Sequence, residues 1–262
     1  MQMHKRKSIW ITKYGAPEVL KLQEDEMAFT SDLPKTPGVE PYVLIEVKAC
    51  GLNFADLMMR MGLYAEAPPR PFIPGYEIAG IVKEVQKGVT KLKPGDRVVA
   101  PCKFGGYTNL ITLPESYVYK IPDHLSFEEA ACIPVNFITA WIALHEMGRV
   151  RKGDTVLIQS AAGGVGTAAV QMAALAGAKV TGLVGSVDKK DYVKKLGAQE
   201  VLTYSEYEQK RNSSPPPRYD IILDSKGGSE LKKCFKDLAS MGRVITFGVS
   251  QMITSNKRSI LS

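Results

Sequence analysis

QSAAGGVGTAAVQMAALAG, residues 159–177, decides the fold of this chain. Three glycines, Gly163, Gly164 and Gly166, follow a short apolar run and precede a stretch with helical spacing. Dinucleotide-binding proteins use such a turn to bring backbone close to a pyrophosphate, but glycine also serves any tight turn between a strand and a helix. The segments around the turn distinguish the two interpretations.

Strands and helices alternate regularly around the glycine turn. Five short apolar runs separated by helical stretches are predicted to be strands: TVLIQS, KVTGLV, EVLTY, YDIILD and GRVITFG. Repeated strand–helix–strand units form a parallel sheet with right-handed crossovers. The sequence therefore predicts an α/β fold with a doubly wound, Rossmann-type domain over residues 126–262, and the glycine turn is its dinucleotide fingerprint.

The fingerprint reads Ala161-x-Gly163-x-x-Gly166, with alanine at the position of the first glycine. Gly163 is predicted to let the backbone approach the pyrophosphate, and Gly166 to let the helix pack closely on its strand. The helix that begins here supplies amide donors and the positive end of its dipole. The predicted phosphate-binding residues are therefore Ala161, Gly163, Gly164, Val165 and Gly166.

Residues 1–125 follow a different pattern, in which short β-rich segments alternate with turn residues: SIWITKYG, YVLIEVKACGL, IAGIVKEV, PGDRVVAP, YTNLITLP and YVYKIP. This pattern predicts a compact all-β domain. Residues 24–41, EDEMAFTSDLPKTPGVEP, are predicted to form a surface connection because of their acids and prolines. The period changes at Ser126, where Ser-x-x-Glu predicts the start of a helix.

Composition limits the partners of the chain. The 262 residues are 45% hydrophobic and carry a net charge of +7. All of the excess lies in residues 151–262, which hold 17 Lys and Arg against 10 Asp and Glu. A basic segment of this kind could bind nucleic acid, a phosphate-bearing ligand or an anionic membrane. Its lysines are nevertheless predicted mostly to form a solvated helix face. No recognition-helix motif or stacking platform favours nucleic acid.

The compartment also follows from the sequence. No run of about 18 apolar residues occurs, and the basic start lacks the apolar stretch of a signal peptide. The four cysteines form no CxxC pair, which favours reduced thiols rather than disulfides or a zinc cluster. A cytoplasmic protein is predicted.

Several motifs resemble those of a known family. The glycine turn, ACGLNFADLMMRMGLY (residues 49–64) and PPRPFIPGYEIAG (residues 68–80) are similar to the zinc-independent quinone oxidoreductases of the medium-chain dehydrogenase/reductase superfamily. NFADLM followed by R, GLY and PP most resembles the vesicle amine transport protein branch. The resemblance implies a GroES-like substrate domain over residues 1–125, a Rossmann cofactor domain over residues 126–262, and a site between them.

The end of the chain departs from the family pattern. The resemblance implies a sixth strand and a return segment to the substrate domain, whereas this chain stops just after the fifth predicted strand. Five strands of the cofactor sheet are therefore expected here. A homodimer, which relatives form through the sixth strand, is expected for the full-length family form.

The zinc ligands of metal-dependent relatives correspond here to Asn53, Tyr76-Glu77 and Val135. A catalytic zinc needs about three protein ligands, which these side chains do not supply, so no metal is predicted. The favoured reaction is then hydride transfer from a nicotinamide to an acceptor that is already electrophilic, such as a quinone or an α,β-unsaturated carbonyl.

The resemblance also implies site residues in the first domain. Asn53 and Tyr64 are expected to line the acceptor pocket and are the candidate catalytic residues; the alternatives are that Asn53 bonds a turn and that Tyr64 covers an apolar patch. Asp56 and Arg60, at helical i,i+4 spacing, are predicted to form a local ion pair. Thr139 matches a family position near the nicotinamide, although a helix threonine also bonds its own backbone.

The end of the second predicted strand favours NADPH over NADH. An NAD site places Asp or Glu about 20 residues after the glycine turn, whereas this strand ends Val184-Gly185-Ser186. A 2′-phosphate needs donors and a cation. Ser186 is predicted to cap the following helix, Gly185 to leave room and Lys189 to supply charge, unless Lys189 is one more solvated lysine. By resemblance, Tyr204 faces the same pocket, and Phe247 also belongs to the cofactor site.

Two functions are compatible with these observations. The first is an NADPH-dependent, zinc-independent reductase of small quinones or enones. The second is a vesicle- or membrane-associated binding protein that retains the fold with little or no turnover, with lysine-rich helices meeting anionic lipid at the membrane surface.

Overall fold

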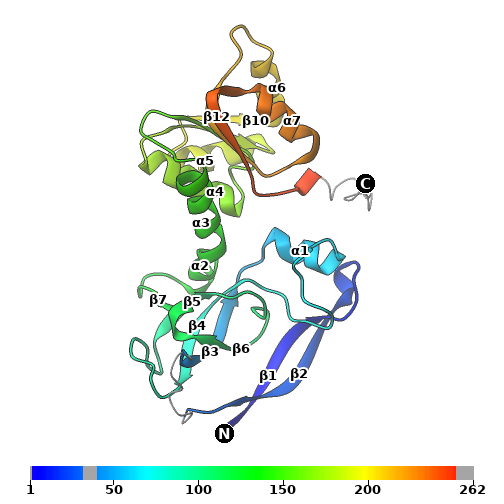
Figure 1. The fold of residues 1–262 in the computed structure, drawn as a ribbon, viewed down its shortest axis with the longest axis vertical. Coiled ribbons are helices and arrows are strands. Elements are labelled where there is room, and N and C mark those ends of the chain that lie inside the picture. Colours follow the sequence, from blue (N-terminus) through cyan, green and yellow to red (C-terminus); the bar gives the residue numbers. More distant parts are fainter. Residues whose placement is uncertain (1, 32–39, 252–262) are drawn as a thin grey trace. The chain divides into compact units, whose positions relative to one another are not determined.

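The structure is a computed structural model that describes residues 2–31 and 40–251. The chain divides into two compact units between Val135 and Asn136, and Figure 1 shows the order of their elements. This division falls later than the predicted boundary between residues 125 and 126. The reason is α2 (Phe127–Ala131), whose buried alanines pack on the sheet of the first unit through Ala79 and Ile121.

The first unit contains a five-stranded antiparallel sheet with the strand order β6-β3-β4-β5-β7. Its strands are β3 (Tyr42–Cys50), β4 (Glu77–Val85), β5 (Arg97–Pro101), β6 (Leu110–Pro114) and β7 (Tyr119–Lys120). All five lie in segments with predicted β-structure. The helix α1 (Phe54–Met61) follows β3, and single turns of helix occur at η1 (Pro17–Val19) and η2 (Glu115–Tyr117).

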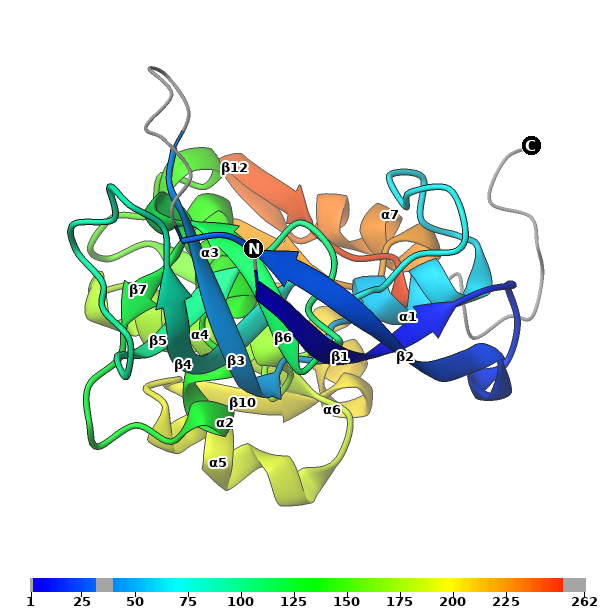
Figure 2. The same cartoon turned by 90° about the horizontal axis from the view of Figure 1, so that it is seen from below.

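A long hairpin of β1 (Gln2–Ile11) and β2 (Leu20–Phe29) completes the first unit, and Figure 2 shows the two strands side by side. The prediction that residues 24–29 belong to a surface connection is therefore wrong. Their charges pair across the hairpin, Glu24 with Lys7 at 2.9 Å and Asp25 with Arg6. An exposed two-stranded ribbon tolerates charged side chains, so the apolar alternation of a strand is missing. Residues 32–39 of that predicted connection lie outside the described residues.

The second unit contains the predicted parallel sheet, with the strand order β10-β9-β8-β11-β12. Its strands are β8 (Thr155–Ile158), β9 (Lys179–Val184), β10 (Glu200–Thr203), β11 (Tyr219–Asp224) and β12 (Leu238–Thr246). The strand order reverses between β8 and β11. The carboxyl ends of these two strands therefore form the switch point where α/β sheets bind ligands.

Helices of the second unit connect these strands. They are α4 (Gly164–Leu175), α5 (Lys190–Lys195) after the turn η4 (Val187–Lys189), α6 (Tyr204–Arg211) and α7 (Gly228–Lys236). The helix α3 (Pro134–Trp141), in which the division between the units falls, continues into η3 (Ile142–Met147). None of the helices in residues 2–31 and 40–251 is long and apolar enough to cross a membrane.

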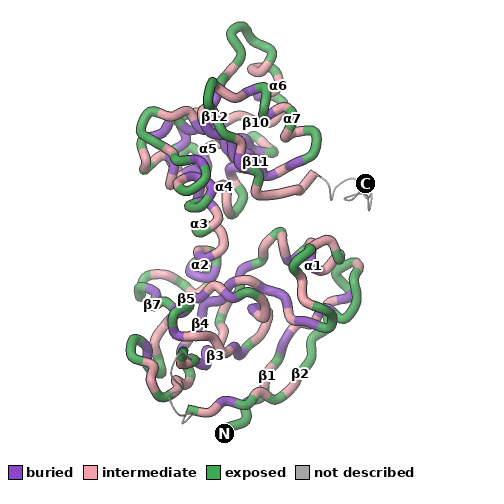
Figure 3. Tube along the Cα trace, viewed as in Figure 1, coloured by how far each residue is buried: buried purple, intermediate pink, exposed green. Residues whose placement is uncertain are grey.

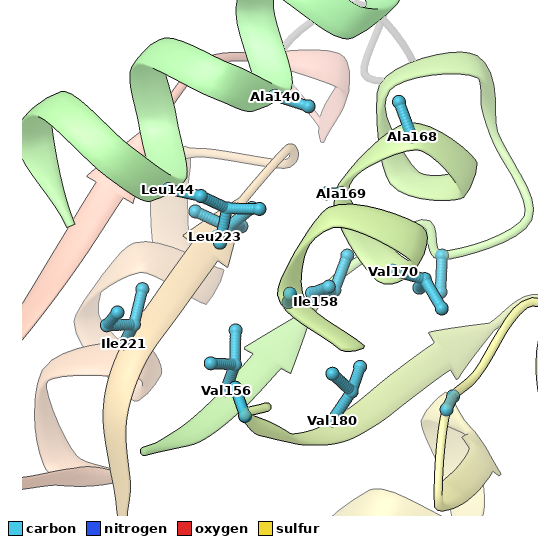
Figure 4. Packing of buried hydrophobic residues seen from close by; sticks show 14 of the residues in the cluster. Ala140, Leu144, Val156, Ile158, Ala168, Ala169, Val170, Val180, Ile221 and Leu223 are labelled. Carbon is cyan, nitrogen blue, oxygen red and sulfur yellow. The ribbon is translucent and has the colours of Figure 1, made fainter. Parts of the chain in front are cut away.

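Both faces of the parallel sheet are covered, so successive side chains of one strand enter two different cores. Figure 4 shows Val156 and Ile158 of β8 pointing to the face that α4 covers. Leu157, between them, packs on the other face with Tyr207 and Cys234 of α6 and α7. Figure 3 shows β11 buried along nearly its whole length. This two-sided burial explains why the strands of the second half read as continuous apolar runs.

Candidate functional site

The glycine turn lies between β8 and α4, at the carboxyl end of a central strand. Gly163 is the N-cap of α4 and has extended backbone, with φ −84° and ψ 174°. A β carbon on Gly166 would lie 2.2 Å from the carbonyl oxygen of Ser160 and 2.8 Å from Ala161 Cα, so only glycine fits there. The first amides of α4, which have no acceptor within the helix, are thereby held at the end of β8.

The other residues of the fingerprint also have structural partners. A β carbon on Gly164 would lie 2.4 Å from Asn136 Oδ1, and one on Gly163 would lie 3.1 Å from the carbonyl oxygen of Ser160. Val165 packs against the core. Ala161 is fully buried and its amide already donates to the carbonyl of Leu183 at 2.9 Å. Ala161 therefore joins the turn to β9, and its amide is not a free donor.

Ser160 joins the ends of three strands and was not among the predicted site residues. Its φ of +50° lies in the left-handed region, which is strained for a residue other than glycine. Its amide donates to the hydroxyl of Tyr204 at 3.0 Å, and its hydroxyl lies 2.7 Å from that of Ser225. Tyr204 follows β10 and Ser225 follows β11, so these hydrogen bonds tie the switch point together.

The loop after β11 is fixed by a buried carboxylate. Asp224 accepts from the amides of Lys226 at 3.0 Å and Gly227 at 3.1 Å, and from the hydroxyl of Thr246 at 3.1 Å. The amide of Ser225 donates to the side chain of Gln159 at 3.3 Å. A loop held by this many hydrogen bonds has a preformed shape before any ligand binds.

The carboxyl end of β9 carries no acidic side chain, and a β carbon on Gly185 would meet nothing within 4 Å. Ser186 precedes η4, but its hydroxyl makes no cap, so the prediction that it caps this helix is wrong. The hydroxyl bonds the carboxylate of Asp188 instead and thereby lowers the pKa of that carboxyl. Lys189 is exposed.

Three further predicted cofactor residues take different places. Tyr204 is the first residue of α6, and the ammonium of Lys226 lies 3.3 Å from the centre of its ring. Phe247 directly follows β12, packs on the core, and donates its amide to the carbonyl of Asp224 at 3.0 Å. Tyr204 and Phe247 therefore lie at the same sheet edge as the glycine turn. Thr139 is half-buried on α3, outside this hydrogen-bonded group.

A second cluster lies in the first unit, around Glu77, which is 1% exposed. Its Oε1 accepts from Asn53 Nδ2 and its Oε2 from the amide of Val135, each at 2.8 Å. Burial raises the pKa of Glu77, and these two hydrogen bonds oppose that rise. A β carbon on Gly51 would lie 2.0 Å from Oε1, so the carboxylate is enclosed. The three positions that match zinc ligands in relatives do lie together. They are joined by hydrogen bonds from Asn53 and Val135 to the Glu77 carboxylate and not by an arrangement of metal ligands.

Asp56 belongs to the same region. It lies in the first turn of α1, and its carboxylate accepts from the amides of Asn53 at 2.8 Å and Gly75 at 3.0 Å. Burial raises its pKa. Arg60 instead donates to the carbonyl of Gly15 at 2.6 Å. The predicted Asp56–Arg60 ion pair is therefore wrong, because the capping role of Asp56 turns its carboxylate inward.

Tyr64 lies in an aromatic cluster of the first unit. Its ring centre is 6.2 Å from that of Tyr76, which lies 5.5 Å from that of Phe104. Burial and a hydrogen bond with Tyr64 raise the pKa of Tyr76. Tyr64 therefore packs on an apolar surface, as one interpretation held, and also contributes a polar atom to it.

The donor set of this cluster does not fit a catalytic zinc. Glu77 provides one carboxylate, both of whose oxygens accept hydrogen bonds, and the neighbouring ligand positions are an amide, a phenol and a valine. A catalytic zinc needs about three ligating side chains. Residues 2–31 and 40–251 contain no group of three or more His, Cys, Asp or Glu side chains placed to hold a metal.

Ser160, Ser225 and Lys226 are the residues at the sheet edge that sequence reasoning missed. The available signal was their position, because each follows β8 or β11, the two strands that flank the switch point. None of the three belongs to the glycine fingerprint, so that motif does not indicate them.

Comparison with known proteins relates each unit to a dehydrogenase domain family. Residues 39–123 match the alcohol dehydrogenase GroES-like domain, and residues 164–261 match the zinc-binding dehydrogenase family. The synaptic vesicle membrane protein VAT-1 homolog of Rattus norvegicus is 37% identical over 254 residues, which are 96% of this chain and 61% of that protein. This chain therefore spans about three fifths of the length of that relative.

Two further relatives are oxidoreductases. The quinone oxidoreductase of Rattus norvegicus is 34% identical over 261 residues, which cover 98% of this chain and 77% of that enzyme. The crystal structure of Escherichia coli quinone oxidoreductase complexed with NADPH is similar with a TM-score of 0.80 and 32% identity. That match covers 92% of this chain and 73% of the other.

Proposed function

The chain belongs to the medium-chain dehydrogenase/reductase superfamily, in the branch of the quinone oxidoreductases and VAT-1-like proteins. From this premise we propose that it is an NADPH-dependent, zinc-independent reductase of quinones or α,β-unsaturated carbonyls. The observation that carries the proposal is the β8–α4 turn, where Gly166 brings the start of a helix against the end of a central strand. A related enzyme has been solved in complex with NADPH.

The second unit supplies the groups that hold the nucleotide. The free amides at the start of α4 bind the pyrophosphate, next to Gly163 and Gly164. Lys189 binds the 2′-phosphate, and Ser186 donates to it once its hydroxyl leaves the nearby carboxylate of Asp188. Because β9 itself ends without a carboxylate, no acid at its last residue selects a free 2′-hydroxyl.

The first unit supplies the acceptor side. A bound nicotinamide supplies the hydride. Asn53 and Tyr64 position the acceptor, and the Asn53 amide donates to the oxygen on which negative charge develops. Glu77 holds one of the two Asn53 N–H groups at 2.8 Å, which fixes the plane of the amide and leaves the second N–H as a donor.

The same cluster supports the proposal that the reaction is independent of zinc. An isolated carbonyl of an aldehyde or ketone gains much from a Lewis acid, and the side chains around Glu77 do not form a zinc site. A quinone or an enone is already electrophilic and needs only orientation and a hydrogen-bond donor. The chemistry of the donor set therefore favours these acceptors.

Two measurements test the proposal. NADPH fluorescence is recorded on titration with the protein, and NADPH oxidation is then followed with a simple ortho-quinone and with an enone. We expect saturable binding and acceptor-dependent oxidation that Asn53→Ala reduces without changing NADPH affinity. A protein that binds no nucleotide would contradict the proposal.

A second candidate function is a peripheral membrane role, which the likeness to the VAT-1 homolog favours. On α5 and the turn before it, Lys189, Lys194 and Lys195 are exposed beside Tyr192, which is 51% exposed. Each lysine near an anionic surface contributes about 1 kcal/mol. Co-sedimentation with phosphatidylserine vesicles, and none with phosphatidylcholine vesicles, is the expected result, and equal behaviour with both would exclude this role for the charges.

A further inference from the structure

Lys226 occupies an unusual position for a lysine. It follows the buried end of β11, is itself half-buried, and places its ammonium 3.3 Å from the centre of the Tyr204 ring. Such a contact over an aromatic face holds a cation in place. Lys226 is therefore part of the switch-point edge, unlike the exposed lysines of α5 and α7.

The Lys226 ammonium has carboxylates near it but none in direct contact: Glu230, Asp224 and Glu208 act on its charge from beyond ion-pair distance. The residues that the structure describes form no ion pair with it, and the neighbouring Glu230 is paired with Lys233 at 2.8 Å. Burial lowers the pKa of Lys226. A partly desolvated cation with no carboxylate in direct contact gains more from an incoming anion than a fully hydrated surface lysine does.

The backbone that carries Lys226 is preformed. Asp224 accepts from the Lys226 amide at 3.0 Å, and the preceding Ser225 is bonded to Ser160 at 2.7 Å. The Tyr204 hydroxyl accepts from the Ser160 amide at 3.0 Å and lies 3.4 Å from the Ser160 hydroxyl. A cation and a phenol hydroxyl are thus brought together by hydrogen bonds to one strained residue, Ser160.

The position of Tyr204 indicates which anion this pair meets. Tyr204 directly follows β10, the neighbour of β9, and its hydroxyl reaches the turn after β8, on the other side of β9. In this fold the end of the second strand, here β9, is where the ribose 2′ position is read. The pyrophosphate instead meets the N-terminus of α4. The Tyr204–Lys226 pair therefore lies on the ribose side.

We propose that Lys226, held against Tyr204, binds the ribose 2′-phosphate and selects NADPH over NADH. The inference rests on the proposed nucleotide site and adds to it a second cation besides Lys189. A 2′-phosphate carries nearly two negative charges at neutral pH, which one exposed lysine balances only in part. Lys226 supplies the remaining charge from a fixed position.

The test uses the full chain and measures binding rather than turnover. Isothermal titration calorimetry compares 2′,5′-ADP, which carries the 2′-phosphate, with 5′-AMP, which lacks it. Lys226→Met removes the charge at similar length, and Lys226→Arg retains it. Lys232→Met is the matched control, because Lys232 is an exposed lysine of α7 and the change in net charge is the same.

We expect Lys226→Met to weaken 2′,5′-ADP binding by about tenfold or more, the loss of one charge-assisted hydrogen bond, and to change 5′-AMP binding less than about twofold. Lys226→Arg and Lys232→Met should retain the affinity for both ligands. Equal losses for both ligands would assign Lys226 to the shared 5′-phosphate or to the fold and overturn the proposal. So would an unchanged affinity for 2′,5′-ADP.

Two controls separate this inference from the proposed function. If the unaltered protein binds neither adenosine ligand nor NADPH, the proposed nucleotide site fails and Lys226 has no role there. If it binds NADPH and Lys226→Met binds it equally well, only the inference fails. Should Lys226→Met lower the unfolding midpoint, Lys226→Gln replaces it, since a polar side chain tolerates the half-buried position.

Discussion

The side-chain amide of Asn53 donates to the buried carboxylate of Glu77 across 2.8 Å, and this bond joins the N-cap of α1 to the first residue of β4. The second oxygen of Glu77 accepts from the Val135 amide, also at 2.8 Å. One carboxylate thus holds two segments that are distant in the sequence. If Asn53 contacts the acceptor, Glu77 is the residue that positions it.

The first prediction concerns this bond. Glu77→Gln should lower the free energy of unfolding by about 2 kcal/mol. The reason is that one of the two N–H donors, on Asn53 or Val135, then faces the N–H group of the new side-chain amide and loses its acceptor. Asn53→Asp should also destabilise, since it places two carboxylates together. The double variant Asn53→Asp/Glu77→Gln restores a hydrogen bond with donor and acceptor exchanged.

Urea unfolding of the four proteins measures the coupling. We expect the double variant to be at least about 1 kcal/mol more stable than the sum of the single changes implies. Recovery of stability without recovery of quinone reduction would show that the Asn53 amide acts on the acceptor. Additive effects would mean that the two side chains do not interact in solution.

The second prediction concerns the glycine turn. Gly166→Ala should destabilise the chain by at least about 2 kcal/mol, because the new methyl group would lie 2.2 Å from the Ser160 carbonyl oxygen. Gly185→Ala is the control, since a β carbon there meets nothing within 4 Å, and should change stability by less than about 0.5 kcal/mol. Thermal and urea unfolding of both variants decide the point; similar effects at the two sites would contradict the close packing of α4.

The third prediction concerns nucleotide selection at the end of β9. Lys189→Ala should weaken NADPH binding by about tenfold and leave NADH binding nearly unchanged, because only the former carries the 2′-phosphate. Lys194→Ala, another exposed lysine nearby in the sequence, should change neither. Fluorescence titration of the unaltered protein and both variants with each nucleotide measures the six affinities. Better binding of NADH than of NADPH by the unaltered protein would refute the assignment.

The fourth prediction is a pH dependence at the start of α6, which carries Tyr204. Hydrogen bonds from Lys190 and from Thr203 lower the pKa of Glu206 to about 2. Because the folded pKa is below the usual value of 4.5, Glu206 stabilises the fold above pH 4.5 and loses that contribution as the pH falls toward 2. Glu206→Gln should therefore melt at a lower temperature than the parent at pH 7, and the difference should shrink in acid. A difference that stays constant from pH 7 to the acid limit would exclude this linkage.

The fifth prediction concerns metal content. Protein dialysed against a chelator should keep its NADPH affinity, its unfolding midpoint and any reductase activity, because the side chains around Glu77 do not form a zinc site. Elemental analysis before and after dialysis provides the control. One tightly held zinc per chain, with activity lost on its removal, would be the opposite result.

The sequence by itself determined the parallel sheet and the position of the glycine turn. Both are encoded locally, in apolar runs that must be buried on two faces and in a glycine at a position where a β carbon would have no space. The absence of an acid at the end of β9 was also readable, because it depends on one position after one strand. The β1–β2 hairpin was only partly readable, since the charges of β2 pair across an exposed ribbon instead of alternating with apolar residues.

Only the tertiary structure decided the partners of the polar side chains. Asp56 and Arg60 have the spacing of an ion pair, yet Asp56 turns inward to the Gly75 amide, which sequence spacing does not reveal. Glu77 reaches Asn53 and Val135, which are 24 and 58 residues away. Lys226 meets Tyr204 because parallel strands bring their carboxyl ends to one edge. Periodicity along the chain specifies which face of an element is buried, whereas the partner of a polar atom depends on which distant segments packing brings within about 3 Å.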